Sequence, residues 1–143
     1  MKPLHILLVE DNDGDILLIQ EAFEEAKVAN NLKVVKDGEK ALNYLQKKGG
    51  FIDAASPDLI ILDINLPRMN GHEVLKEIKE SDEFKQIPVI MLTTSSSEID
   101  VVKSYKNHAN CYITKPVDVE DFFEAVLGIE EFWISLVRLP SKS

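Results

Sequence analysis

Carboxylate residues follow two of the short apolar runs in this sequence. The run Ile6–Val9 ends in Glu10 and Asp11, and the run Leu59–Leu62 ends in Asp63. If these runs are neighbouring parallel strands, the acids meet at one edge of the sheet, where the carboxyl ends of the strands lie. Like charges at short range repel each other, and a divalent cation removes that conflict. Oxygen ligands that leave room for water favour Mg²⁺ over Ca²⁺ or Zn²⁺. The spacing therefore predicts a magnesium site.

Two further apolar runs are followed by residues that can hold a phosphoryl group. Thr93 follows the run Val89–Leu92, and Lys115 comes shortly after Cys111–Ile113. A magnesium ion that keeps several waters usually binds a phosphate. The Lys115 ammonium could neutralise one phosphoryl oxygen, and the Thr93 hydroxyl could donate to another. The carboxylate of Asp63 could attack phosphorus and become an aspartyl phosphate, with the cations stabilising the charge of the transition state.

The elements that must position these residues are recognisable from hydrophobic periodicity. Continuous Ile, Leu and Val runs are typical of strands that are buried on both faces. The predicted strands are Ile6–Val9, Leu32–Val35, Leu59–Leu62, Val89–Leu92 and Cys111–Ile113. Amphipathic segments between them predict helices at Asp15–Ala29, Glu39–Gln46, after Asn70, at Ser97–Asn107 and from Asp118 onward, with a long loop at Lys47–Pro57. The alternation predicts an α/β protein with an open parallel sheet and helices on both faces.

Composition restricts the classes of protein to consider. The chain has 143 residues, 45% hydrophobic and 29% charged, which is typical of one soluble globular domain. Its net charge of −9 disfavours binding to nucleic acid or to an anionic membrane. Its apolar runs are far shorter than the roughly 20 residues of a membrane span. A single cysteine, Cys111, and an N-terminus without signal-peptide features predict a cytoplasmic protein.

Four sequence blocks resemble the motifs of bacterial response-regulator receiver domains. The blocks are Leu8–Asn12, Ile61–Gly71, Pro88–Thr94 and Ile113–Pro116, and their order and spacing fit over residues 4–128. The resemblance implies a flavodoxin-like (CheY-like) fold with a five-stranded parallel sheet of order 2-1-3-4-5. It also implies a phosphorylated signalling protein of a two-component phosphorelay rather than an enzyme.

The resemblance implies a role for each matching residue. Asp63 would accept a phosphoryl group from a sensor histidine kinase, while Thr93 and Lys115 would hold the phosphoryl oxygens. Mg²⁺ would be bound by the side chains of Asp11 and Asp63, by the backbone carbonyl of Asn65 and, through water, by Glu10. Tyr112 lies where the family has a switch aromatic that acts together with Thr93. The alternative for Tyr112 is an ordinary place in the core of its strand.

The C-terminal third supports a narrower resemblance. The segments His108–Asp118 and Phe132–Trp133 are similar to those of single-domain regulators that partner bacterial and cyanobacterial phytochrome kinases. We therefore expect residues 1–143 to form one receiver domain, with a core at 4–128 and an extended C-terminal helix and tail at 129–143.

The last predicted helix carries a wide apolar stripe that is longer than its own sheet requires. We expect this stripe to form a symmetric homodimer. The predicted contacts are Phe132, Trp133, Leu136 and Val137. The alternative is that the helix folds back on the core of its own chain.

Two other functions fit parts of the pattern. A flavodoxin-like flavin carrier shares the topology, but the acidic segment Glu10–Asp15 would repel the flavin phosphate unless a metal intervened. A phosphatase with an aspartyl intermediate usually has a second acid two residues after the nucleophile, where this chain has Asn65. Asp58 lies at the opposite end of the strand that leads to Asp63, about 17 Å away. We therefore expect Asp58 to have no role in the chemistry.

Overall fold

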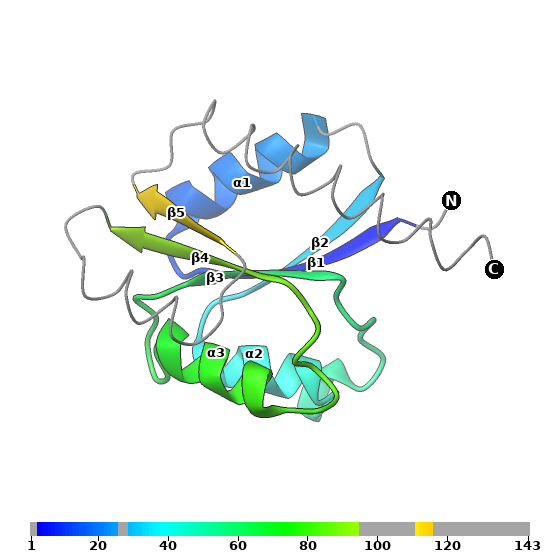
Figure 1. The fold of residues 1–143 in the computed structure, drawn as a ribbon. Helices are drawn as coiled ribbons and strands as arrows, with labels where there is room; N and C mark the ends of the chain where they lie inside the picture. The colour runs from blue at the N-terminus through cyan, green and yellow to red at the C-terminus, as the bar shows by residue number, and fades with distance from the viewer. Residues whose placement is uncertain (1–2, 26–28, 95–110, 116–143) are drawn as a thin grey trace.

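The computed structural model describes residues 3–25, 29–94 and 111–115. The elements in chain order are β1 (Leu4–Val9), α1 (Asp13–Glu25), β2 (Asn30–Val35), α2 (Gly38–Leu45), η1 (Gly49–Phe51), β3 (Leu59–Asp63), α3 (Gly71–Glu80), β4 (Val89–Thr94) and β5 (Cys111–Lys115). All neighbouring strands pair in parallel, in the order β2-β1-β3-β4-β5. Figure 1 shows α1 on one face of the sheet and α2 and α3 on the other. The predicted fold class and strand order are therefore confirmed.

The core consists of two apolar layers, one on each side of the sheet. Strand residues such as Leu8 and Ile61 pack with Ile19 and Phe23 of α1. Their neighbours along the strands pack with α2 and α3, as Leu62 does. All five residues of β3 are buried, which explains why its sequence is continuously apolar and not alternating.

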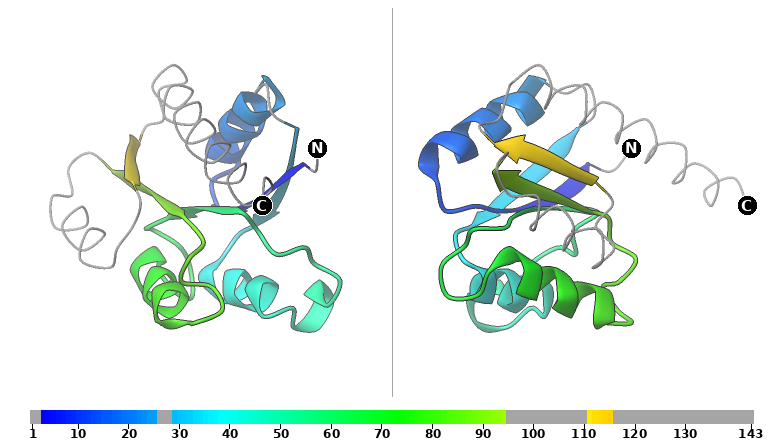
Figure 2. Two further views of the ribbon diagram at one scale, coloured as in Figure 1. Left: turned by 45° about the vertical axis from the view of Figure 1, so that its right-hand side comes forward. Right: turned by 60° about the vertical axis from the view of Figure 1, so that its left-hand side comes forward.

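The strand register brings the ends of the strands together at one edge. Val9 pairs with Leu62, so Glu10 directly follows β1 at the level at which Asp63 ends β3. Asp63 in turn pairs with Leu92, and Thr94 pairs with Lys115. The carboxyl ends of β1, β3, β4 and β5 therefore meet at the same edge, as the two views in Figure 2 show.

The bounds predicted for the first helix were wrong at both ends. The helix starts at Asp13, because the Asn12 side chain caps it by accepting a hydrogen bond from the Asp15 amide at 2.9 Å. Ala29 lies outside any helix, and its carbonyl accepts from the Leu4 amide at 2.8 Å at the start of the sheet. The apolar stripe alone could not show this early end.

The segment predicted as a loop at Lys47–Pro57 contains the short 3₁₀ helix η1. The Phe51 ring of η1 packs edge-on against Tyr44 of α2, with ring centroids 5.4 Å apart. The Tyr44 hydroxyl donates to the Ala55 carbonyl at 3.1 Å, and burial raises the pKa of this phenol. These contacts explain why the Tyr44 side chain is buried.

Several predictions concern residues outside the described part of the chain. These are the helices predicted at Ser97–Asn107 and after Asp118, and the dimer contacts Phe132, Trp133, Leu136 and Val137. For Thr93, Tyr112 and Lys115 the structure gives the position of the backbone in β4 and β5. Within the described ranges, none of the helices is long and apolar enough to span a membrane.

Candidate metal and phosphoryl-transfer site

Three carboxylates meet at the carboxyl edge of the sheet. Glu10, Asp11 and Asp63 each offer an oxygen, and these oxygens lie within 4.8 Å of one another. Glu10 and Asp63 are buried, and Asp11 is exposed. The predicted convergence of these acids is thus confirmed, and it follows directly from the pairing of β1 with β3.

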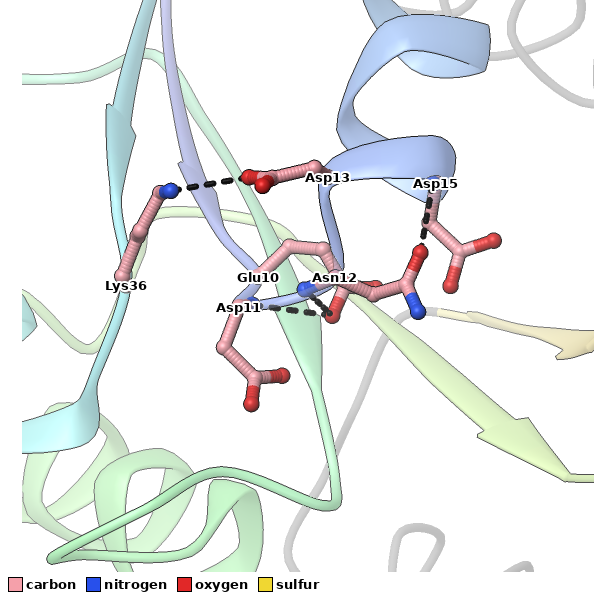
Figure 3. Close-up of polar contacts among 6 residues, drawn as sticks. All are labelled: Glu10, Asp11, Asn12, Asp13, Asp15 and Lys36. Carbon is pink, nitrogen blue, oxygen red and sulfur yellow. Dashed lines mark hydrogen bonds and ion pairs between the residues drawn. The ribbon is translucent and has the colours of Figure 1, made fainter.

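The buried Glu10 side chain folds back onto the chain that follows it. Its Oε2 atom accepts hydrogen bonds from the backbone amides of Asp11 at 3.0 Å and Asn12 at 3.3 Å (Figure 3). Glu10 therefore fixes the turn that presents Asp11. The sequence indicated a metal ligand at this position but did not reveal this second role, which depends on a side-chain rotamer.

A salt bridge beside this turn neutralises a neighbouring acid. Lys36, just after β2, donates to Asp13 at 2.8 Å, and both side chains are largely exposed. Figure 3 shows the contact joining the end of β2 to the start of α1. Asp13 is thereby paired with a protein cation at the edge of the acidic group.

The loop after Asp63 turns back onto the strand that it leaves. The Asn65 amide donates to Oδ1 of Asp63 at 3.2 Å, which orients the carboxylate. The Ile64 carbonyl accepts from the Leu66 amide at 3.2 Å and from the Gly71 amide at 2.8 Å. Gly71 is the first residue of α3, so this bond places the start of the helix directly against the end of β3.

Asn70 stabilises the start of α3 through a reciprocal capping box. Its side chain accepts from the Glu73 amide at 3.0 Å, and the Glu73 carboxylate accepts from the Asn70 amide at 3.3 Å. The helix predicted after Asn70 is therefore confirmed, and Asn70 is its N-cap. The loop that carries Asn65 is thus fixed at both ends, by β3 and by α3.

The donor set fits a hard divalent cation. All three ligand atoms are carboxylate oxygens, which are suited to Mg²⁺ or Mn²⁺. Two like charges about 4 Å apart repel each other by about 1 kcal/mol even in water. Grouping these carboxylates without a cation is therefore costly. A bound cation would remove that repulsion and leave positions for oxygens from water or phosphate.

The other predicted site residues reach the same edge by their backbones. Asp63 pairs with Leu92, so Thr93 extends one residue beyond it on the adjacent strand. Thr93 pairs with Thr114 and Thr94 pairs with Lys115, so Lys115 lies on the next strand one residue beyond the level of Thr93. The exposed Asn65 lies two residues after Asp63. The roles assigned to Thr93, Lys115 and Asn65 stay predictions.

Asp58 lies at the opposite end of β3, as predicted. Its Oδ2 accepts from the His5 amide at 2.9 Å, and its own amide donates to the His5 carbonyl at 2.7 Å. Asp58 therefore ties the start of β3 to β1, and its carboxylate has a structural role far from the acidic cluster.

Comparison with known proteins points to one family. A family model described as the response regulator receiver domain matches residues 6–127. Response regulator Rcp1 from Synechocystis sp. is 45% identical over 139 residues, which cover 97% of this chain and 95% of that protein. The probable methanogenesis regulatory protein FilR2 from Methanothrix harundinacea is 42% identical over 139 residues, covering 96% of this chain and 88% of that protein.

Solved structures agree with this assignment. The phosphorylated cyanobacterial phytochrome response regulator RcpA has a TM-score of 0.83 and 48% identity, covering 94% of this chain and 96% of that one. The Mn²⁺-bound form of Rcp1 has a TM-score of 0.82 and 46% identity, covering 92% of this chain and 94% of that one. Both are similar to this chain over almost its whole length.

Proposed function

This chain belongs to the response regulator receiver domains and is a two-component signalling protein, and we propose that its phosphoacceptor is Asp63. The observation that carries this proposal is the convergence of Glu10, Asp11 and Asp63 within 4.8 Å at the carboxyl edge of the sheet. Asp63 is the member of this group that ends a central strand and lies next to β4, where Thr93 follows. It is therefore the carboxylate that a phosphoryl group held by Thr93 and Lys115 would reach.

The proposed reaction is transfer from a phosphohistidine of a sensor kinase. A carboxylate oxygen of Asp63 attacks phosphorus, the nitrogen–phosphorus bond breaks, and the imidazole of the donor takes the electron pair. The Asn65 amide, bonded to Oδ1, holds the carboxylate in a fixed orientation for this attack. Thr93 donates from its hydroxyl to one phosphoryl oxygen, and Lys115 neutralises another.

We propose Mg²⁺ as the ion, held by the carboxylates of Asp11 and Asp63 and by the backbone carbonyl of Asn65. When bound, it supplies positive charge that compensates these carboxylates and the phosphoryl oxygens. Glu10 would act through water, which agrees with the engagement of its Oε2 by two backbone amides. The Mn²⁺-bound structure of Rcp1 supports a divalent cation in a similar chain.

We propose a phytochrome-type kinase as the donor, because RcpA is described as a phytochrome response regulator and is 48% identical to this chain. A light-sensing phytochrome kinase carrying labelled phosphate is expected to lose its label to this protein within minutes. The transfer should require Mg²⁺ and stop when a chelator is added, since three acids must be compensated before a phosphoryl anion can approach.

Gel autoradiography measures this transfer, with an unrelated histidine kinase as the control donor. Fast transfer from the unrelated kinase alone would overturn the phytochrome assignment. Because the chain is also similar to FilR2, a kinase of another pathway is the main alternative donor. Transfer that persists unchanged without divalent ions would contradict the proposed role of the acidic cluster.

The proposed consequence of phosphorylation is a shift between two states of the β4–β5 side of the molecule. A phosphoryl group on Asp63 adds negative charge that draws Thr93 and Lys115 towards it, and Tyr112 follows into the space that Thr93 leaves. We propose that residues 1–143 act as one receiver domain, with a core at 4–128 and a C-terminal extension at 129–143. The signal would then be conveyed by partner binding or by self-association.

We propose that Phe132, Trp133, Leu136 and Val137 form a homodimer contact. Sedimentation at micromolar concentration is expected to show a dimer that Trp133→Glu converts to a monomer, because a buried charge without a partner opposes association. Leu17→Glu is the matched control, since Leu17 is also a large apolar residue and is 56% exposed on α1. A wild-type protein that sediments as a monomer would refute the proposed dimer.

A further inference from the structure

Arg68 adopts an unusual backbone conformation in the loop that follows Asp63. Its φ angle is +66°, in the left-handed region that residues other than glycine rarely occupy. Such a conformation is costly and persists only where the surrounding structure maintains it, often at functional sites. The contacts of Arg68 therefore indicate what maintains this loop.

The guanidinium of Arg68 reaches two carboxylates of the β2–α2 turn. Its Nε lies 3.9 Å from Oδ2 of Asp37, and its Nη1 lies 3.8 Å from Oε2 of Glu39. The Asp37 side chain is only 10% exposed and is fixed as the cap of α2, since its Oδ1 accepts from the Lys40 amide at 2.7 Å. Asp37 is thus a rigid partner for the Arg68 guanidinium.

The backbones of the two loops also lie against each other. A Cβ atom at Gly38 would meet the carbonyl oxygen of Met69 and would lie 2.8 Å from Val74. Gly38 is therefore required for the close approach of the β2–α2 turn to the backbone of Met69. The loop after Asp63 is held by β3 on one side and by this turn on the other.

We propose that Arg68 is a positioning residue for the cation site. Its contacts with Asp37 and Glu39 hold the loop at residues 64–70, and this loop carries the Asn65 amide that orients Asp63. The same contacts fix the place of the Asn65 carbonyl. This inference rests on the proposed function of the acidic cluster as a divalent-cation site.

The direction in which the affinity for the cation changes when Arg68 is replaced distinguishes a positioning role from a purely electrostatic one. Removing a positive charge near a cation site strengthens cation binding if only Coulomb forces act. Removing a residue that positions the ligands weakens cation binding instead, by roughly 10–100-fold for well-buried supporting groups. Because the Arg68 side chain is 69% exposed, we expect a loss at or below the lower end of that range.

The experiment is a titration with Mn²⁺ in which electron paramagnetic resonance measures the free ion. For Arg68→Gly, which suits a left-handed backbone, the dissociation constant for Mn²⁺ is expected to rise about five- to tenfold. The urea midpoint should be unchanged or higher, because the backbone strain is removed. Arg68→Lys keeps the cation and should recover most of the affinity. Arg68→Asn, which also tolerates this backbone, is the second variant if the glycine variant does not fold.

Two further variants test the partners and the backbone. Asp37→Asn combined with Glu39→Gln removes both anchoring charges while an asparagine cap remains, and adding Arg68→Gly should weaken binding no further. Lys47→Gly is the matched control, because Lys47 has a φ of +57° but follows α2 at its other end, and its Mn²⁺ affinity should equal that of the wild type.

If the wild type binds Mn²⁺ and Arg68→Gly binds it equally well or more tightly, the proposed positioning role of Arg68 is wrong. That result would leave the proposed function of the acidic cluster untouched. A wild-type protein that binds no Mn²⁺ and takes no phosphoryl group from acetyl phosphate would instead overturn the proposed function.

Discussion

Replacing Asp63 by asparagine is expected to abolish acid-labile phosphorylation, with incorporation of label falling at least a hundredfold. An amide oxygen carries no full negative charge and is a poor nucleophile towards phosphorus, so no acyl phosphate can form at this position. The substitution also removes one charge from a group of three acids within 4.8 Å of one another. Without divalent ions, the free energy of unfolding should therefore rise by about 1 kcal/mol.

Asp58→Asn is the matched control for this experiment. It makes the same chemical change on the same strand, but at the end where Asp58 bonds to the backbone of His5. An asparagine oxygen can still accept that hydrogen bond, so phosphorylation should stay at the wild-type rate. Equal labelling of Asp63→Asn and the wild type would show that another residue is the acceptor.

Gly71→Ala is expected to lower the free energy of unfolding by about 3 kcal/mol, the upper part of the usual range for overpacking. A Cβ atom at this position would meet the carbonyl oxygen of Asp63 and would lie 2.7 Å from Cα of Ile64. These are backbone atoms of a buried strand end and cannot move aside cheaply. Helix propensity alone favours alanine by about 1 kcal/mol, so a loss of stability would show that the steric conflict dominates.

Urea unfolding followed by circular dichroism measures this loss, with Gly50→Ala as the control. A Cβ atom at Gly50 meets nothing within 4 Å, so this variant should be close to the wild type in stability. The folded fraction of Gly71→Ala should also accept phosphate more slowly, because the clash displaces the backbone of Asp63. A variant as stable as the wild type would mean that α3 can move away from β3.

The sequence was sufficient to predict the sheet and the meeting of the acids. Continuous apolar runs specify buried parallel strands, and the acids that follow β1 and β3 must meet once those strands pair. The family match favours the receiver assignment over the two alternatives, the flavin carrier that shares the topology and the phosphatase with an aspartyl intermediate. Helix ends were predicted less well, as Ala29 shows, because caps and the start of the next strand decide them.

The contacts that hold the site in place could not be predicted from the sequence. Glu10 bonds to the amides that follow it, and Arg68 takes a left-handed backbone beside Asp37. Both features depend on rotamers and loop conformations, which have no periodic signal. The dependence of the loop on Gly38 and Gly71 is likewise visible only once the neighbouring backbone is placed.

The complete burial of β3 has a consequence for handling the protein. Leu59–Asp63 is rich in Leu and Ile, has no glycine or proline and resembles the segments that stack into amyloid-like aggregates. In the native sheet it is shielded between β1 and β4. When the sheet opens, solubility depends on mutual repulsion between chains with a net charge of −9. Mild acid protonates the carboxylates and removes that repulsion. Heating in mild acid should therefore cause precipitation, whereas heating at neutral pH should allow refolding on cooling.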